Sequence, residues 1–234
     1  MINHEFNTVN VSDGSTVEVY TAFPVSDQKS PAIILIQEAF GVTGHIRSVA
    51  ERLCKEGYAV ASPDIFHRTV HRLEASYEDF PSIMPHYQAL TKENLIADLK
   101  AVFEFLQNNK NVNSEKIGCI GFCLGGRVAF LANTALPISA AVSYYGGGLD
   151  LLADEAKNMN CAHLFFWAGL DSNITIDKVD TIINAVKKAG KEYTSVTFSK
   201  ANHAFNNDER PVFNPTASKE AWAHTLAFFE NRLK

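Results

Sequence analysis

The sequence has no long apolar run and few cysteines. No apolar stretch approaches the ~18 residues of a membrane-spanning helix, so we expect no membrane partner. The first residues lack the basic start and apolar core of a secretory signal, which favours a cytoplasmic protein. No two of the four cysteines form a Cys-x-x-Cys pair, and a chain this long rarely depends on disulfides, so we expect reduced thiols.

Positive charge is also scarce. The formal net charge is -5, which argues against nucleic acid as the main partner. The 234 residues contain 46% hydrophobic residues, and neither a repeat nor a long linker interrupts them. Because this length suits one α/β unit with one core, the sequence predicts a single domain over residues 1–234.

Short apolar runs alternate with segments of helical periodicity along the chain. We expect strands at 16–22, 32–36, 58–61, 116–121, 140–145, 163–167 and 193–198. We expect helices at 46–56, 85–109, 125–133, 174–189 and 216–232, and an irregular lid at 67–85. Such alternation predicts an α/β fold, with a mostly parallel sheet covered by helices on both faces.

The most informative stretch joins the strand at 116–121 to the helix that follows it. It reads Gly121-Phe122-Cys123-Leu124-Gly125-Gly126. This is the layout of a nucleophile elbow, in which small residues permit a tight strand-to-helix turn and the nucleophile sits at its tip. The helix N-terminus would favour a thiolate at Cys123.

Two further residues complete a catalytic set. Asp171 and His203 each follow an expected strand, and the order of Cys123, Asp171 and His203 is that of the α/β-hydrolase triad. Ligands bind beyond the carboxyl ends of strands in such sheets. We expect His203 to move the proton and Asp171 to hold its tautomer.

The loop after the strand at 32–36 is the second candidate element. The oxyanion hole needs two N–H donors, for which we expect the backbones of Leu124 and Ala39. Glu38 follows a buried strand, where an unpaired acid is costly. Glu38 either pairs with an arginine such as Arg127 or lies beside the nucleophile and controls its protonation. We favour the second, because this loop must approach the nucleophile to build the oxyanion hole.

Other interpretations compete with this one. The cysteine could be a small buried residue, Asp171 could cap the next helix, and the glycine motif could be a dinucleotide loop, although it lacks Gly-x-Gly-x-x-Gly. His67 and His71 have i,i+4 spacing but no further ligand for a metal site. A non-catalytic, ligand-binding protein of the same fold is the main functional alternative.

Taken together, the motifs resemble the dienelactone hydrolase family, which consists of carboxymethylenebutenolidase-like α/β-hydrolases. The resemblance covers almost the whole chain and is carried by residues 37–41, 62–64, 121–126, 143–146, 169–171 and 203–205. It implies a Cys-Asp-His triad, no cofactor, and hydrolysis of a small ester or lactone through an acyl-cysteine. It also implies that Glu38 contacts and helps to activate Cys123.

The resemblance bears on the substrate as well. Arginines bind a substrate carboxylate in members that open the dienelactone, but no arginine directly follows His203-Ala204-Phe205. Arg72 is the candidate in the lid region, with Arg68 beside it. We expect a pocket lined by Phe40, Tyr87 and Tyr144, a small-molecule ester or lactone as partner, and a monomer or weak homo-oligomer.

Overall fold

The computed structural model describes residues 2–234, which form eight strands, six α-helices and one 3-10 helix. The chain divides into two compact units, one ending at Ile117 and one comprising Gly118–Lys234. Strands and helices alternate within both units, so the predicted α/β class is confirmed. The single domain stays a prediction.

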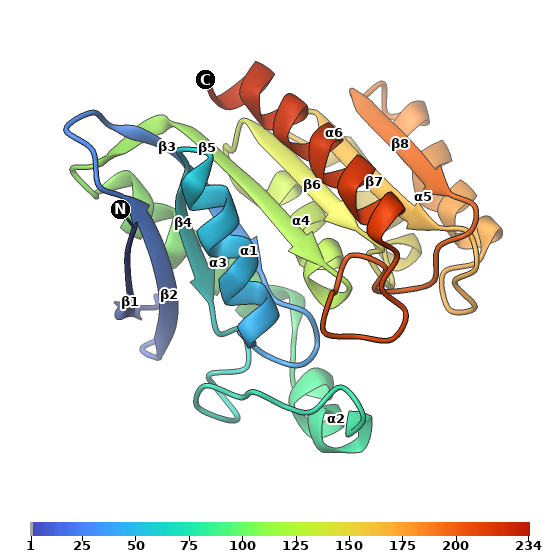
Figure 1. Cartoon of the computed structure of the whole chain (residues 1–234), viewed down its shortest axis with the longest axis horizontal. Coiled ribbons are helices and arrows are strands. Elements are labelled where there is room, and N and C mark those ends of the chain that lie inside the picture. The colour runs from blue at the N-terminus through green and yellow to red at the C-terminus, as the bar shows by residue number, and fades with distance from the viewer. Residues whose placement is uncertain (1) are drawn as a thin grey trace. The chain divides into compact units, whose positions relative to one another are not determined.

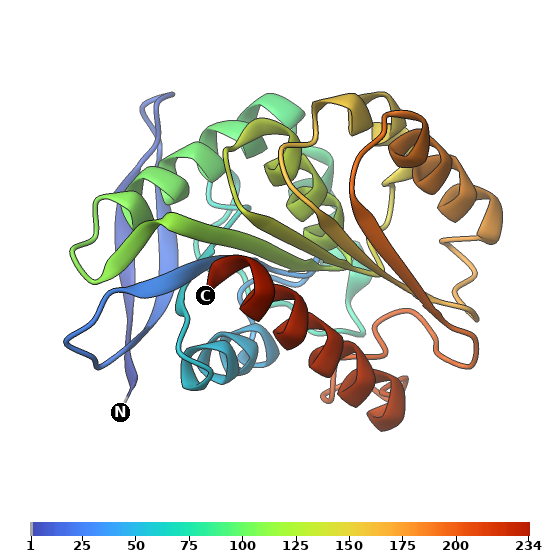
Figure 2. The same cartoon turned by 90° about the horizontal axis from the view of Figure 1, so that it is seen from above.

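The first unit holds four strands in the order β1-β2-β4-β3. Its elements are β1 (Ile2–Asn10), β2 (Thr16–Pro24), β3 (Ser30–Ile36), α1 (Gly44–Lys55), β4 (Ala59–Pro63), α2 (Phe80–Gln88) and α3 (Lys92–Gln107). β1 pairs with β2 and β2 with β4 in antiparallel fashion, whereas β3 and β4 are parallel. Helices α1 and α3 lie on opposite faces of these strands (Figures 1 and 2).

Two features of this unit differ from the sequence-based expectation. Strand β1 was not expected, because its mostly exposed polar residues carry little apolar pattern, yet it pairs with β2 along its whole length. The single helix over 85–109 was wrong: α2 ends before Ala89, and α3 begins after Thr91. The Thr91 side chain accepts the Asn94 N–H at 3.2 Å, and its extended backbone starts a new helix.

The second unit contains only parallel pairings, in the order β5-β6-β7-β8. Its elements are β5 (Val112–Phe122, of which Gly118–Phe122 belong to this unit), α4 (Leu124–Ala135), β6 (Ala140–Tyr144), η1 (Asp150–Asn158), β7 (His163–Ala168), α5 (Ile176–Lys188), β8 (Tyr193–Phe198) and α6 (Pro215–Leu233). α6 covers one face of the strands, and α4 and α5 cover the other (Figure 2). Because the strands are parallel, their carboxyl ends share one edge, where the connecting loops gather.

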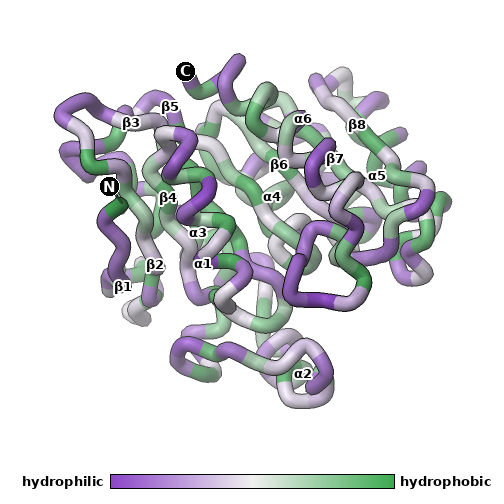
Figure 3. Tube along the Cα trace, viewed as in Figure 1, coloured by the Kyte–Doolittle hydropathy of each residue, from purple (hydrophilic) through white to green (hydrophobic). Residues whose placement is uncertain are grey.

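Burial follows the layers of this unit. Every residue of β6 and β7 is buried, as expected for strands covered on both faces. Hydrophobic residues concentrate along these strands, whereas much of the loop between β8 and α6 is hydrophilic (Figure 3). The core of this unit therefore lies along β6 and β7.

Candidate active site

Cys123 lies at the turn between β5 and α4. Its backbone angles are φ 56° and ψ -116°, in the left-handed region that a residue with a side chain rarely adopts. The Cys123 N–H donates to the Tyr144 carbonyl oxygen at 3.0 Å, and the Gly126 N–H donates to the Cys123 carbonyl oxygen at 3.0 Å. These bonds hold the turn against the end of β6.

Close packing around the turn requires glycine. A Cβ at Gly126 would lie 2.7 Å from the Tyr144 carbonyl oxygen and 2.8 Å from Gly146 Cα. The first turn of α4 thus packs directly on the backbone that ends β6. Leu124 is the first residue of α4, so its N–H lies at the helix N-terminus, where backbone N–H groups lack a partner within the helix.

Asp171 and His203, which are 32 residues apart, meet at the ends of β7 and β8. His203 Nδ1 lies 2.5 Å from Asp171 Oδ2. The other carboxylate oxygen of Asp171 accepts the N–H groups of Asn173 and Ile174 at 2.9 and 3.0 Å. Since α5 begins only after Thr175, Asp171 orders its own loop and orients the imidazole rather than capping that helix.

The His203 side chain also hydrogen-bonds the side chain of Cys123. With Nδ1 committed to Asp171, Nε2 is the nitrogen that faces the sulfur. Burial works against a charged imidazole, yet the pKa of His203 is raised to about 10, because the negative charge and hydrogen bond of Cys123 and those of Asp171 outweigh burial. The imidazolium form of His203 is therefore favoured at neutral pH.

The charge of Asp171 completes this arrangement. Its side chain is 1% exposed, and burial alone would raise its pKa. The hydrogen bond and charge of His203, followed by the two backbone N–H groups, lower the pKa of Asp171 below its ordinary value instead. The carboxylate is therefore ionised wherever the imidazolium is present.

The other cysteines lie in different surroundings. Cys123 is partly exposed, whereas Cys54 and Cys119 are buried. Burial raises the pKa of Cys54 to about 11 and that of Cys161 to about 12, and it raises the pKa of Cys119 further. These three thiols therefore stay protonated and unreactive at neutral pH.

The remaining predicted residues of the second unit are placed as follows. Leu124 is the first residue of α4. Tyr144 is fully buried, and its hydroxyl lies 2.7 Å from the Thr225 hydroxyl in α6, which does not favour contact with a substrate. The ring of its neighbour Tyr145 packs beside that of His203, with the two ring centroids 5.1 Å apart. The sequence motif contains both tyrosines, and only the direction of each side chain distinguishes them.

Five of the predicted site residues belong to the first unit: Glu38, Ala39, Phe40, Arg72 and Tyr87. Glu38 and Ala39 are buried in the loop after β3, and Tyr87 is partly exposed in α2.

Phe40 is buried too, and its ring packs edge-on against Tyr77 at 5.0 Å. The guanidinium of Arg72 pairs with Glu18 at 2.5 Å and lies 4.0 Å above the ring of Phe6. Arg72 is thus already engaged by β1 and β2, which does not favour it as the ligand of a substrate carboxylate.

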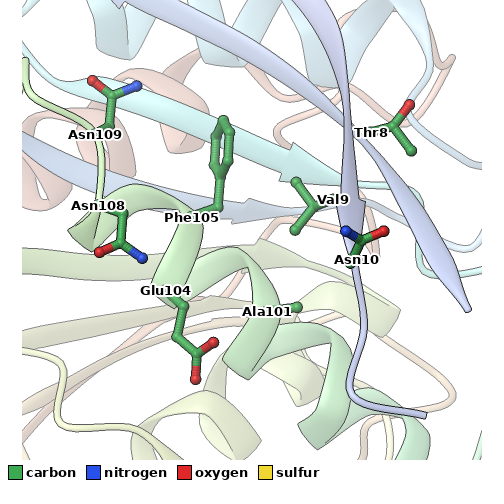
Figure 4. Close-up of a pocket in the computed structure, with 8 residues that line it drawn as sticks. All are labelled: Thr8, Val9, Asn10, Ala101, Glu104, Phe105, Asn108 and Asn109. Atoms are coloured by element: carbon green, nitrogen blue, oxygen red, sulfur yellow. The ribbon is translucent and has the colours of Figure 1, made fainter. Parts of the chain in front are cut away.

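A groove in the first unit is lined by other residues. It has a volume of about 450 Å³ and is lined by Thr8, Val9, Asn10, Ala101, Glu104, Phe105, Asn108 and Asn109 (Figure 4). Its walls come from β1 and the second half of α3. They carry neither cysteine nor histidine, and the Glu104 carboxylate is the only ionisable side chain that lines the groove, so no nucleophile–histidine pair is present there.

Residues 2–234 contain neither a metal-binding cluster nor a membrane-spanning helix. No three side chains of histidine, cysteine, aspartate or glutamate gather there in a way that could hold a metal ion. His67, one of the two histidines with helical spacing, contacts Asp98 at 3.0 Å instead. Within the same residues, no helix combines the length and apolar character needed to cross a bilayer.

Comparison with known proteins gives consistent matches over nearly the whole chain. The sequence profile of the dienelactone hydrolase family matches residues 17–233. A Synechocystis sp. protein named "Putative carboxymethylenebutenolidase" is 31% identical over 225 residues, which are 92% of each chain. A Salmonella typhi protein of the same name is 31% identical over 229 residues, covering 93% of this chain and 84% of that protein.

A similar solved structure comes from Klebsiella pneumoniae and is described as a "Putative Dienelactone Hydrolase". It has a TM-score of 0.90 and 27% sequence identity, and the match covers 98% of this chain and 99% of that one.

Proposed function

This chain belongs to the dienelactone hydrolase family, whose α/β-hydrolase fold it shares, and we propose that it hydrolyses small esters or lactones through an acyl-cysteine on Cys123. Family membership identifies the chain as a hydrolase of ester or lactone bonds. One observation carries the proposal for the nucleophile: the His203 side chain bonds Cys123 on one side and Asp171 on the other.

In the proposed mechanism, acylation begins from the ion pair that the Cys123 thiolate forms with the His203 imidazolium. The Cys123 sulfur attacks the carbonyl carbon, an S–C bond forms, and the carbonyl oxygen becomes an oxyanion. When the intermediate collapses, the C–O bond to the leaving alkoxide breaks, and the alkoxide takes the proton from His203 Nε2. His203 is then neutral and remains aligned by Asp171.

Deacylation reverses these roles. Neutral His203 accepts a proton from a water molecule while the water oxygen attacks the thioester carbon. The second intermediate expels the Cys123 thiolate and releases the carboxylic acid, which restores the starting ion pair. One ester and one water have then become one acid and one alcohol.

Backbone donors would stabilise both oxyanions. The Leu124 N–H, at the N-terminus of α4, is supported as one donor because the helix dipole and the free N–H groups favour negative charge there. The role proposed for the Ala39 N–H as second donor rests on its place in the loop after β3. The role proposed for Glu38 in activating the thiol rests on the family resemblance and on its place in the same loop. Glu38→Gln is expected to alter the dependence of thiol alkylation on pH.

The substrate is proposed as a small ester or lactone without an obligatory carboxylate. The arginine that sequence reasoning chose for a carboxylate, Arg72, is engaged by Glu18. A panel of lactones and linear esters, each in carboxylated and neutral form, tests this choice. A strong preference for the carboxylated members would contradict it.

The test of the nucleophile uses mass spectrometry of the intact protein after mixing with an activated ester. We expect an acyl adduct on Cys123 that disappears with time, and neither adduct nor turnover in Cys123→Ala. The matched control is Cys161→Ala, which keeps both. Undiminished turnover in Cys123→Ala would refute the mechanism, and an absence of any adduct in the wild type would favour a ligand-binding protein.

The cellular location and the oligomeric state are two further proposals. The four cysteines are free, which supports a reducing, cytoplasmic location. We also propose a monomer or weak homo-oligomer, which sedimentation of the purified chain would test.

A further inference from the structure

Ser143 belongs to a sequence motif that the proposed chemistry does not use. It lies in β6, directly before Tyr144, and is 1% exposed. Its hydroxyl donates to the carbonyl oxygen of Gly126 at 2.5 Å. Gly126 is in the first turn of α4 and its N–H binds the Cys123 carbonyl oxygen, so the side chain of Ser143 reaches the nucleophile's own turn.

A chain of hydrogen bonds connects Ser143 to His163 and Asn133. His163 in β7 is fully buried, and its Nε2 lies 2.8 Å from the Ser143 hydroxyl. The Asn133 amide, near the end of α4, donates one N–H to His163 Nδ1 at 3.2 Å and the other to the Cys161 carbonyl oxygen at 3.0 Å.

The direction of every bond in this chain is determined. Because an amide NH₂ only donates, His163 Nδ1 must accept, and the ring hydrogen is on Nε2. His163 therefore donates to Ser143, and Ser143 is left to donate to Gly126. Each polar group has one role, and a neutral imidazole is required for all of them.

The same chain of hydrogen bonds holds α4 near both of its ends. At one end, Ser143 binds the carbonyl oxygen of Gly126. At the other end, the side-chain carbonyl oxygen of Asn133 accepts hydrogen bonds from the N–H groups of Asn160 and Cys161, just before β7, at 2.9 and 3.0 Å. A helix held at both ends by neighbouring strands cannot slide along its axis without breaking these bonds.

We propose that Ser143 and His163 are positioning residues, which fix α4 along its axis and so hold the Cys123 sulfur against His203. The proposal rests on the proposed function in taking Cys123 as the nucleophile. Two consecutive residues of β6 then fix the elbow: Tyr144 through its carbonyl oxygen and Ser143 through its hydroxyl. A displacement of about 1 Å is enough to cost a large factor in reactivity.

The test measures alkylation of Cys123 by iodoacetamide as a function of pH, with the modified peptide identified by mass spectrometry. This readout needs no substrate, so its outcome is independent of whether an ester is ever hydrolysed. In Ser143→Ala we expect the rate at neutral pH to fall about tenfold and the acidic limb of the profile to move toward higher pH, because the ion pair is less well aligned.

Two variants make the comparison specific. Ser143→Thr keeps the hydroxyl and is expected to recover most of the rate. Ser195→Ala is the matched control: it removes a hydrogen bond of 2.9 Å from Trp167 Nε1 in β7, in the same unit but away from α4. It is expected to lower thermal stability while leaving the profile unchanged.

An unchanged alkylation profile in a folded Ser143→Ala protein would overturn the proposal, since the hydrogen bonds of Ser143 and His163 would then stabilise the fold without positioning the Cys123 sulfur. A second measurement uses the unaltered protein in case the variant does not fold. Nitrogen NMR at neutral pH is expected to show His163 as the neutral Nε2–H tautomer with a slowly exchanging ring proton. The other tautomer, or a charged ring, would equally contradict the bond directions on which positioning depends.

Discussion

The backbone of Gly125 occupies the space that a side chain at Gly121 would need. A Cβ on Gly121 would lie 1.9 Å from the Gly125 carbonyl oxygen and 2.2 Å from its carbonyl carbon. Both atoms are main chain, so no rotamer change relieves the overlap. The strand before Cys123 and the helix after it are therefore in direct backbone contact.

Gly121→Ala is consequently expected to destabilise the protein by more than about 3 kcal/mol or to prevent folding, because the helix must shift away from the strand. Gly147→Ala is the matched control, since a Cβ there would meet nothing within 4 Å, and it should change stability by less than about 1 kcal/mol. Denaturant unfolding measures both. Equal stability of the two variants would contradict the packing.

The charge on His203 is expected to depend on Cys123. In the wild type the ring should titrate with a pKa of about 10. In Cys123→Ala the sulfur's charge and hydrogen bond are gone, burial opposes protonation more effectively, and the pKa of His203 should move down. NMR titration of the ring measures this directly. A value that does not change on removal of the sulfur would show that no ion pair exists.

His163 should make stability depend on pH in acid. Burial lowers its pKa from 6.5 to about 3, so the folded protein resists a proton that the unfolded chain accepts below about 6.5. Stability from this residue is complete above about pH 6.5 and is lost as the pH falls toward about 3, by up to about 1.4 kcal/mol per pH unit.

His163→Phe keeps a ring that can stack on Phe165, whose centroid lies 4.1 Å from that of His163. This variant should be less stable at neutral pH, because the Ser143 and Asn133 bonds are lost, but its stability should fall less steeply in acid. Denaturant midpoints at a series of pH values give the two slopes. Parallel slopes would argue that His163 is protonated in the folded protein.

A buried carboxylate in the first unit should matter for stability but not for chemistry. Both oxygens of Asp98 bind the Arg68 guanidinium at 2.8 Å, and the Asp98 side chain is 1% exposed. Asp98→Asn leaves the arginine without its bidentate partner and should cost about 3 kcal/mol.

Asp13→Asn removes the other carboxylate on Arg68, which lies near solvent, and is expected to cost much less. Thermal unfolding compares the two variants. A larger loss in Asp13→Asn than in Asp98→Asn would reverse the assignment of the buried partner.

Local patterns predicted most of the architecture. Periodicity located α1, α4, α5 and α6 to within a few residues, and apolar runs located β3, β6, β7 and β8, because burial on a helix face or in a covered strand imposes those patterns. β1 and η1 were missed because they carry no clear apolar period. The helix over 85–109 was drawn too long because its periodicity obscured the capping role of Thr91.

By itself, the sequence determined where a nucleophile could be: the glycines around Cys123 permit one sharp turn, and this is a local property of the chain. Only the tertiary structure decided what that residue touches. Four contacts join segments that are far apart in the chain. They are the Asp171–His203 hydrogen bond, the packing of Tyr145 beside His203, the Arg72–Glu18 ion pair, and the link from His163 through Ser143 to Gly126. Such contacts depend on side-chain direction and on which partners reach it, and neither is encoded in the neighbouring residues.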